Sequence, residues 1–244
     1  MDAFSTAACE TGMQVLEGLP AKLAALEQAK AGLFPTAADK VRDEMAAQAA
    51  KASDPSVSNQ AIIGIIDKVQ LAVVDLNSDL QKLERMIRMS IPKAEDGNNW
   101  GVEVQLGVIK IVTDARAAMK ATNDGLKEYF KERSEAVEKL AKSSETKTSE
   151  GTSETEATGG EKDTKETKKS KSTDTSTKTG TACADRTLHL AAIDTRWYFH
   201  LQDGYVAAID GAGYAADSIA KNIQKIQHPR GNQGGDESGR PSYY

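Results

Sequence analysis

The apolar residues of this chain recur mostly at helical spacing, and the clearest case lies within residues 60–90. There they alternate at intervals of four and three, which places them on one face of a helix. Ser58 or Asn59 can cap the first turn, and Pro92 ends the helix because proline disfavours α conformation at the residue before it. About thirty residues at ~1.5 Å each give a rod of about 45 Å, which needs packing partners along its length. The predicted face consists of Ile62, Ile66, Val69, Val73, Leu76, Leu80, Leu83 and Ile87.

The segment after Pro92 fits two patterns. Over residues 102–108 apolar positions alternate as in a strand, whereas over 104–137 they also recur at helical spacing. We interpret the segment as a helix, because the helical stripe is far longer than an ordinary strand. Two apolar faces would also suit a helix buried in its own bundle and against a neighbouring subunit. The helical stripe is Val104, Val108, Ile111, Ala115, Met119, Leu126, Phe130 and Val137.

The first part of the chain has a weaker helical pattern. Residues 4–27 predict a helix that Pro20 should kink or interrupt, since proline removes a backbone donor and clashes with the preceding turn. Residues 30–59 carry Pro35 and Pro55 around an alanine-rich stretch. We expect a loop there, with one short helical piece.

The last helix is predicted from about Asp185 to Gln227. Its Gly204, Gly211 and Gly213 each weaken a helix by about 1 kcal/mol relative to alanine, so tertiary packing must hold it. Its apolar residues are Leu188, Leu190, Ile193, Trp197, Phe199, Leu201, Val206, Ile209, Ile219, Ile223 and Ile226.

One low-complexity stretch divides the chain. Residues 143–183 are almost wholly Ser, Thr, Glu, Lys and Gly, and bury too little apolar surface to offset the entropy of ordering, so we predict a disordered insert. Residues 1–142 then carry helices 1 to 3, including a loop at 91–101. Residues 184–230 carry helix 4, and residues 231–244 form a flexible, glycine-rich tail.

These elements predict an all-α protein, an up-down-up-down four-helix bundle of long helices. Counting reversals places the loop at 91–101 and the tail at one end of the bundle, and the insert at the other. The composition agrees, since 39% of the 244 residues are hydrophobic but only 5% are aromatic, which favours aliphatic helix packing.

Charge and cysteine usage limit the classes of partner and the cellular compartments that we expect for this chain. The net charge of −5 gives no basic field, so we expect neither nucleic acid nor a membrane as partner. The chain start lacks a signal-peptide pattern, and no stretch approaches eighteen apolar residues. Cys9 and Cys183 are far apart, which suggests reduced thiols. We expect a cytoplasmic protein, and the short basic run 168–171 leaves the nucleus open.

The chain carries no recognisable catalytic centre, and we expect no metal and no cofactor. Residues 211–216 fit a lenient dinucleotide-binding pattern, but no surrounding βαβ unit appears, and small residues for close helix contact explain them better. His189 and His200 are three helical turns apart, too far to share a metal. Glu95 and Asp96 are adjacent carboxylates without a neighbouring acid–base constellation, which favours a charged docking loop.

The loop region carries a long and specific resemblance. From Ile91 it reads Ile-Pro-Lys-Ala-Glu-Asp-Gly-Asn-Asn-Trp-Gly-Val, which resembles the activation loop of the 11S (REG) proteasome activators. Residues 127–137 are similar to the third helix of that family. Residues 222–231, with their Pro-Arg-Gly stop, resemble the end of its fourth helix.

The resemblance implies a mechanical function without an enzymatic one. Family members form heptameric rings that dock on the α-ring of the 20S proteasome without ATP. Their C-terminal tails enter pockets between α-subunits, and their activation loops open the gate, which stimulates peptide hydrolysis. Carried over, the activation loop comprises Lys93, Glu95, Asp96, Gly97, Asn98, Asn99, Trp100 and Gly101, where Trp100 replaces the more usual Phe. The docking tail comprises Ser242, Tyr243 and Tyr244.

Two alternatives stay open at the level of sequence. The chain could be a helical scaffold or adaptor whose insert recruits partners without activating the proteasome. It could also be an enzyme using the glycine-rich segment of the last helix, which would require nucleotide binding.

Overall fold

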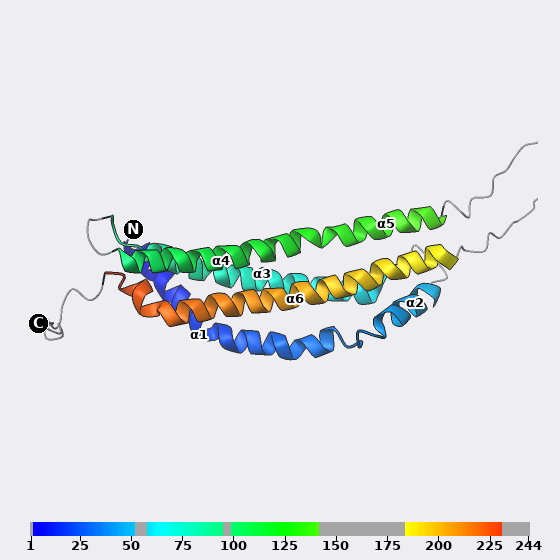
Figure 1. Cartoon of the computed structure of the whole chain (residues 1–244), viewed down its shortest axis with the longest axis horizontal. Helices are drawn as coiled ribbons and strands as arrows, with labels where there is room; N and C mark the ends of the chain where they lie inside the picture. Colours follow the sequence, from blue (N-terminus) through cyan, green and yellow to red (C-terminus); the bar gives the residue numbers. More distant parts are fainter. Residues whose placement is uncertain (1, 52–57, 95–98, 142–183, 231–244) are drawn as a thin grey trace, which may run out of the picture.

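A computed structural model describes residues 2–51, 58–94, 99–141 and 184–230 (Figure 1). The described residues form helices and no strand, which confirms the all-α class. The predicted insert and the predicted tail lie outside the described residues, so both stay predictions. The helices are α1 (Asp2–Leu33), α2 (Val41–Lys51), α3 (Gln60–Met89), α4 (Trp100–Gly125), α5 (Lys127–Ala141) and α6 (Ala184–Gln227).

Four long rods run side by side in alternating directions: α1, α3, α4 continued by α5, and α6 (Figure 1). α3 packs against α1, α4 and α6, and α6 also contacts α1, α2 and α5. This arrangement confirms the predicted four-helix bundle. None of the described helices combines the length and the apolar character needed to cross a bilayer.

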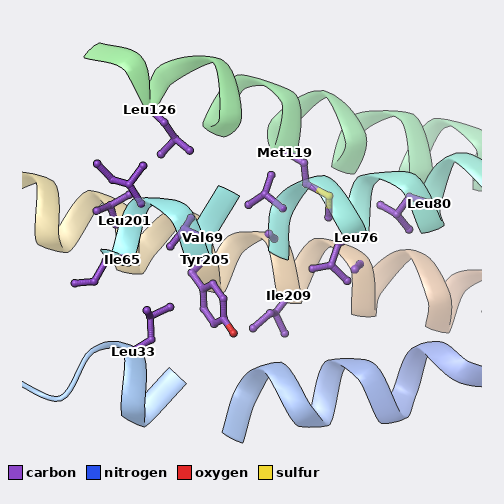
Figure 2. Close-up of a cluster of buried hydrophobic side chains, with 14 of the residues drawn as sticks. Leu33, Ile65, Val69, Leu76, Leu80, Met119, Leu126, Leu201, Tyr205 and Ile209 are labelled. Atoms are coloured by element: carbon purple, nitrogen blue, oxygen red, sulfur yellow. The ribbon is translucent and has the colours of Figure 1, made fainter. Parts of the chain in front are cut away.

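The predicted face of α3 forms the centre of the core. All eight of its apolar residues are at most 3% exposed. Figure 2 shows Val69, Leu76 and Leu80 of this face between the other helices. Burying such a side chain contributes about 1.5–3 kcal/mol relative to leaving it exposed, so this face accounts for much of the packing energy. Asn59 caps α3 as expected, because its side-chain oxygen accepts from the amides of Ala61 and Ile62, at 3.2 and 3.4 Å.

The segment after Pro92 is helical, as interpreted, but a tight turn separates α4 from α5. The amide of Leu126 donates to the carbonyl of Asn123 at 3.3 Å, a bond across three residues. Such a turn has 3.0 residues per turn and shifts the face that follows. Phe130, which the predicted apolar stripe includes, therefore lies off the face that is buried within the bundle. Phe130 is 48% exposed, and its neighbour Tyr129 is buried instead.

α1 is one continuous helix through Pro20, and Figure 1 shows its axis bending between its darker and lighter blue parts. The helix extends past the predicted end at residue 27 to Leu33, because Leu33 and Phe34 are buried against the core and the Phe34 amide donates to the Lys30 carbonyl at 2.9 Å. α2 is the short helical piece expected within residues 30–59.

α6 contains the glycine-rich pattern considered for a dinucleotide. Residues 205–216 lie wholly within this helix, so the strand that the dinucleotide pattern requires does not form there. Ala212 and Ala215 are fully buried, and Gly204 lies against Thr122 of α4, where an added Cβ would lie 2.9 Å from the threonine methyl. The small residues thus allow close helix contact, as expected.

Candidate docking end of the bundle

One end of the bundle gathers four chain segments. They are the beginning of α1, the end of α3, the beginning of α4 and the end of α6 (Figure 1, left). Both flanks of the predicted loop and the residues that lead into the predicted tail therefore share this end, as the count of reversals indicated.

Gln105 joins three of these segments from inside the bundle. Its side chain is fully buried on α4. Its Nε2 donates to the carbonyl of Ser90, which caps the end of α3, at 3.0 Å, and to the carbonyl of Ile226 in the last turn of α6, at 2.7 Å. The last carbonyls of a helix have no partner within the helix, so these two bonds satisfy groups that the fold would otherwise bury unpaired.

Gly101 brings the first turn of α4 against the chain just after α6. A Cβ added to Gly101 would lie 2.0 Å from the carbonyl oxygen of Pro229 and 2.5 Å from its Cα. Since both atoms belong to the backbone, only glycine fits at this contact. The glycine of the loop motif thus has a packing role in this chain.

Arg230 completes the contact from the other side. Its guanidinium donates to the carbonyl oxygen of Lys93, which lies on the flank of the loop before α4. Both flanks of the loop therefore contact residues 229–230, directly before the predicted tail. We call this set of contacts, made by Lys93, Gly101, Gln105, Pro229 and Arg230, the loop–tail clasp.

The other predicted site residues that are described lie at the surface. Trp100 is 64% exposed although it is large and aromatic. Asn99 precedes α4, and its carbonyl accepts from the amides of Val102 and Glu103 at 2.9 and 3.1 Å. Lys93 is exposed. An exposed tryptophan beside exposed polar groups is typical of a protein contact surface. Glu95, Asp96, Gly97, Asn98, Ser242, Tyr243 and Tyr244 lie outside the described residues.

Sequence reasoning missed three members of the clasp. Pro229 and Arg230 were interpreted only as a helix stop, and Gln105 was given no role. Gln105 follows Gly101 by four positions and precedes Val108 by three, so it occupies the buried stripe of α4. A polar residue at an apolar position of a helix is the signal that could have identified it.

Ion pairs on α3 fix the helices that lead to this end. Asp79 is buried and pairs with Lys22 of α1 and with Lys82. Glu84 pairs with Arg116 of α4 and with Arg88. Burial alone raises the pKa of each carboxyl, but the hydrogen bonds from these cations outweigh it and hold both pKa values below their ordinary range.

Metal-binding side chains do not cluster in the described part of the chain. Within it, no three His, Cys, Asp or Glu residues gather closely enough to hold a metal ion. What it does offer at this end is a set of side chains arranged around two backbone segments.

Comparison with known proteins finds a family that matches part of the chain. A family model for the C-terminal part of the proteasome activator PA28 matches residues 56–150, which include α3, the loop and α4. Over this part of its length the chain resembles the PA28, or 11S, family. The resemblance drawn from the loop motif is thereby confirmed.

Two PA28 relatives show how far the sequence similarity extends. Proteasome activator 28 of Dictyostelium discoideum is 32% identical over 85 residues, which are 35% of this chain and 38% of that protein. Proteasome activator complex subunit 3 of Homo sapiens is 29% identical over 85 residues, 35% of this chain and 34% of that protein. The match thus spans little more than a third of the length of these curated relatives.

Solved structures of 11S proteins share the fold over nearly the whole chain. The 11S subunit of the Plasmodium falciparum proteasome, PA28, superposes with a TM-score of 0.61 at 14% identity, covering 94% of this chain and 93% of that one. A chain in a complex of an archaebacterial 20S proteasome with PA26 gives a TM-score of 0.65 at 17% identity, covering 98% and 99%. The 11S fold therefore includes α1 and α6, which the PA28 family model does not match.

Proposed function

We propose that this protein is an ATP-independent activator of the 20S proteasome. The match to the PA28 family model and an 11S fold support this proposal, as does the similarity to a chain in a proteasome complex. The observation that carries it is the loop–tail clasp, because it joins both flanks of the predicted activation loop to the base of the predicted docking tail. An activator that docks through one element and opens a gate through the other needs both at one end.

The proposed mechanism uses binding energy alone. Ser242, Tyr243 and Tyr244 dock in pockets on the α-ring, and the activation loop from Lys93 to Gly101 stabilises the open form of the gate. Without ATP, opening requires that the activator bind the open gate more tightly than the closed one. Several weak contacts from one ring raise the total affinity through avidity. In this proposal the protein needs neither a catalytic centre nor a cofactor.

We also propose that identical copies assemble into a ring of seven. A groove of about 960 Å³ lies between α1 and α3, and Tyr205 of α6 also lines it. Its lining includes Leu71 and Val74, two of the large hydrophobic residues that the described chain leaves exposed. Exposed apolar surface of this kind marks protein contact sites, and a contact between unlike faces of identical copies closes into a ring.

The assembly is tested by the native mass of the purified chain. The proposal predicts a heptamer, and Leu71→Glu should shift it to smaller species because it places a charge in the groove. Leu188→Glu, at an exposed leucine outside the groove, is the matched control and should leave the mass unchanged. A monomeric wild-type chain would contradict the ring.

The activity is tested by peptide hydrolysis. Purified chain is mixed with 20S proteasome without ATP, and hydrolysis of a fluorogenic peptide is measured beside a version lacking residues 242–244. Stimulation that disappears on truncation supports activation through the tail. Asn98→Tyr should abolish stimulation even where rings still bind, and full activity in that variant would remove the loop from the mechanism. A confirmed ring that does not stimulate would favour the scaffold alternative or a need for a partner subunit.

We propose the cytoplasm as the location, with the nucleus as a second one. The support comes from the sequence alone, in which we find no signal-peptide pattern. The basic run at 168–171 is the reason for keeping the nucleus as a second location, although it is too short to be identified as a nuclear import signal. Fluorescence microscopy of the tagged chain tests this, and a signal confined to an organelle lumen would contradict it.

A further inference from the structure

We infer that the loop–tail clasp couples docking to gate opening, with Arg230 and Gln105 as positioning residues for the activation loop. The inference rests on the proposed function and extends it. It assigns a role to side chains that the loop motif does not include and that, in the case of Arg230, lie outside the region matched by the PA28 family model.

The geometry links the two ends of the loop to a single short segment. Before the loop, the Lys93 carbonyl accepts from Arg230. After the loop, Gly101 lies against the backbone of Pro229. Residues 229–230 are the last described residues before the predicted tail, so any change in the position of the tail base acts on both flanks of the loop together.

The contact between the tail base and the loop flanks is tightly packed. At Gly101 two backbone segments touch with no side chain between them, and the atoms nearest to an added Cβ are the carbonyl oxygen, the Cα and the carbonyl carbon of Pro229. One turn further along α4, Gln105 is fully buried and bonds to Ile226 and Ser90, which holds the end of α6 and the end of α3 against the same helix. A displacement of the tail base therefore moves the loop flanks instead of being absorbed by side-chain motion.

Coupling follows from this rigidity. When the tail docks, residues 229–230 lose freedom of movement, and the flanks of the loop lose it with them. The loop then meets the gate already positioned, so less of its binding energy is spent on ordering and more is available to favour the open form. In a chain without the clasp, the tail would still dock but the loop would be positioned poorly.

Arg230 gives the sharpest test, because its bond to Lys93 lies at the surface and the helices are held by other contacts. Arg230→Ala removes the donor, and Arg230→Lys keeps a cationic donor and serves as the matched control. Two quantities are measured for each ring: its affinity for 20S proteasome, and the peptide hydrolysis at saturating activator. The clasp predicts that Arg230→Ala leaves the affinity within about twofold but lowers saturated stimulation about fivefold, the lower end of typical coupling between two sites. Arg230→Lys should recover most of the stimulation.

A second measurement tests the clasp without the proteasome. Hydrogen exchange of the amides in residues 90–104 should become faster in Arg230→Ala than in wild type, while exchange in the middle of α3 stays the same. This readout depends only on whether the side chain restrains the loop flanks.

The outcomes separate the two proposals. If wild type stimulates and Arg230→Ala matches it at saturation, the coupling inference is wrong while the proposed function stands. A loss of stimulation that only follows a loss of affinity would likewise overturn it, since Arg230 would then be a docking residue. If wild type itself neither binds nor stimulates, the proposed function fails, and the coupling fails with it even where hydrogen exchange confirms the contact.

Discussion

The two ends of the bundle are held together by different kinds of contact. At the docking end, side chains of Gln105 and Arg230 bond to backbone carbonyls, and Gly101 packs on backbone. At the opposite end, side chains converge on one buried carboxylate. Asp194 of α6 accepts from Asn59 at 2.9 Å, from the Tyr129 hydroxyl at 3.1 Å and from Arg133 at 3.4 Å.

The difference indicates that one end mainly stabilises the fold and that the other mainly serves the function. The Asp194 network joins α5, α6 and the cap of α3, and Trp197 packs edge-on against Tyr129 with ring centroids 5.8 Å apart. Removing either charged member, Asp194 or Arg133, leaves the other charge unpaired inside the bundle, which is costly for folding. At the docking end, contacts with the backbone instead hold the chain in place on both flanks of the loop. Trp100 is left exposed there. We expect changes at the Asp194 end to affect stability first, and changes at the docking end to affect function first.

The largest stability effect should follow Asp194→Ala. It leaves the Arg133 guanidinium, the Tyr129 hydroxyl and the Asn59 amide without their shared acceptor, and breaking a buried pair in this way costs about 3 kcal/mol. Denaturant unfolding measures the loss. Asp203→Ala, on the exposed side of the same helix, is the control and should stay within about 0.5 kcal/mol of wild type. A small effect at Asp194 would contradict the structural role of this end.

Gly101→Ala should have the next largest effect, and it should act on function more than on stability. The new Cβ would displace the Pro229 backbone, and such overpacking costs about 1–3 kcal/mol. Stimulation at saturation should be lost even in variants that remain folded. Gly107→Ala on the same helix meets no atom within 4 Å and should keep both stability and stimulation. Equal behaviour of the two variants would refute the close contact.

Acid should destabilise the half of the bundle that leads to the docking end. The folded pKa values of Asp79 and Glu84 lie below their ordinary values of 3.8 and 4.5. A lowered folded pKa contributes stability above the unfolded pKa and loses it as pH falls through the folded pKa. Unfolding free energy should therefore decline as pH falls from above 4.5 to below 3.8, and Glu84→Gln should make that decline shallower. A decline as steep as in wild type would show that Glu84 contributes little to it.

The smallest stability effect should follow Trp100→Ala. A substitution at a mostly exposed position usually changes stability by less than about 0.5 kcal/mol. Its effect on stimulation should be clear, because an exposed aromatic at a contact surface contributes strongly to binding. Melting temperature and stimulation are compared in the same preparation. Unchanged stimulation would remove Trp100 from the contact with the proteasome.

The sequence predicts the helices better than the contacts between their ends. The face of α3 follows from local spacing, and Asn59 follows from cap chemistry, so both were predictable. The tight turn at Leu126 depends on tertiary packing, which is why Tyr129 and not Phe130 is buried. Periodicity identifies which face is buried, but it does not identify the partner of a residue on that face.

The contacts at both ends of the bundle show the same limit of prediction from sequence. Gln105 bonds to a carbonyl 121 positions away, and Tyr129 bonds to a carboxylate 65 positions away. Local patterns carry no information about such pairings. The loop was identified as an activation loop only through its resemblance to a family, whereas the reason for Gly101, its contact with Pro229, required the structure.

Crosslinking to the 20S proteasome tests most directly which end of the bundle acts. A photoreactive residue is placed at Lys93, on the docking end, or at Arg42 of α2, on the opposite end, since both positions are exposed. We predict that the Lys93 position crosslinks to α-subunits, that the Arg42 position does not, and that removing residues 242–244 abolishes the crosslink. Crosslinking from Arg42, or from neither position while stimulation is present, would contradict the account.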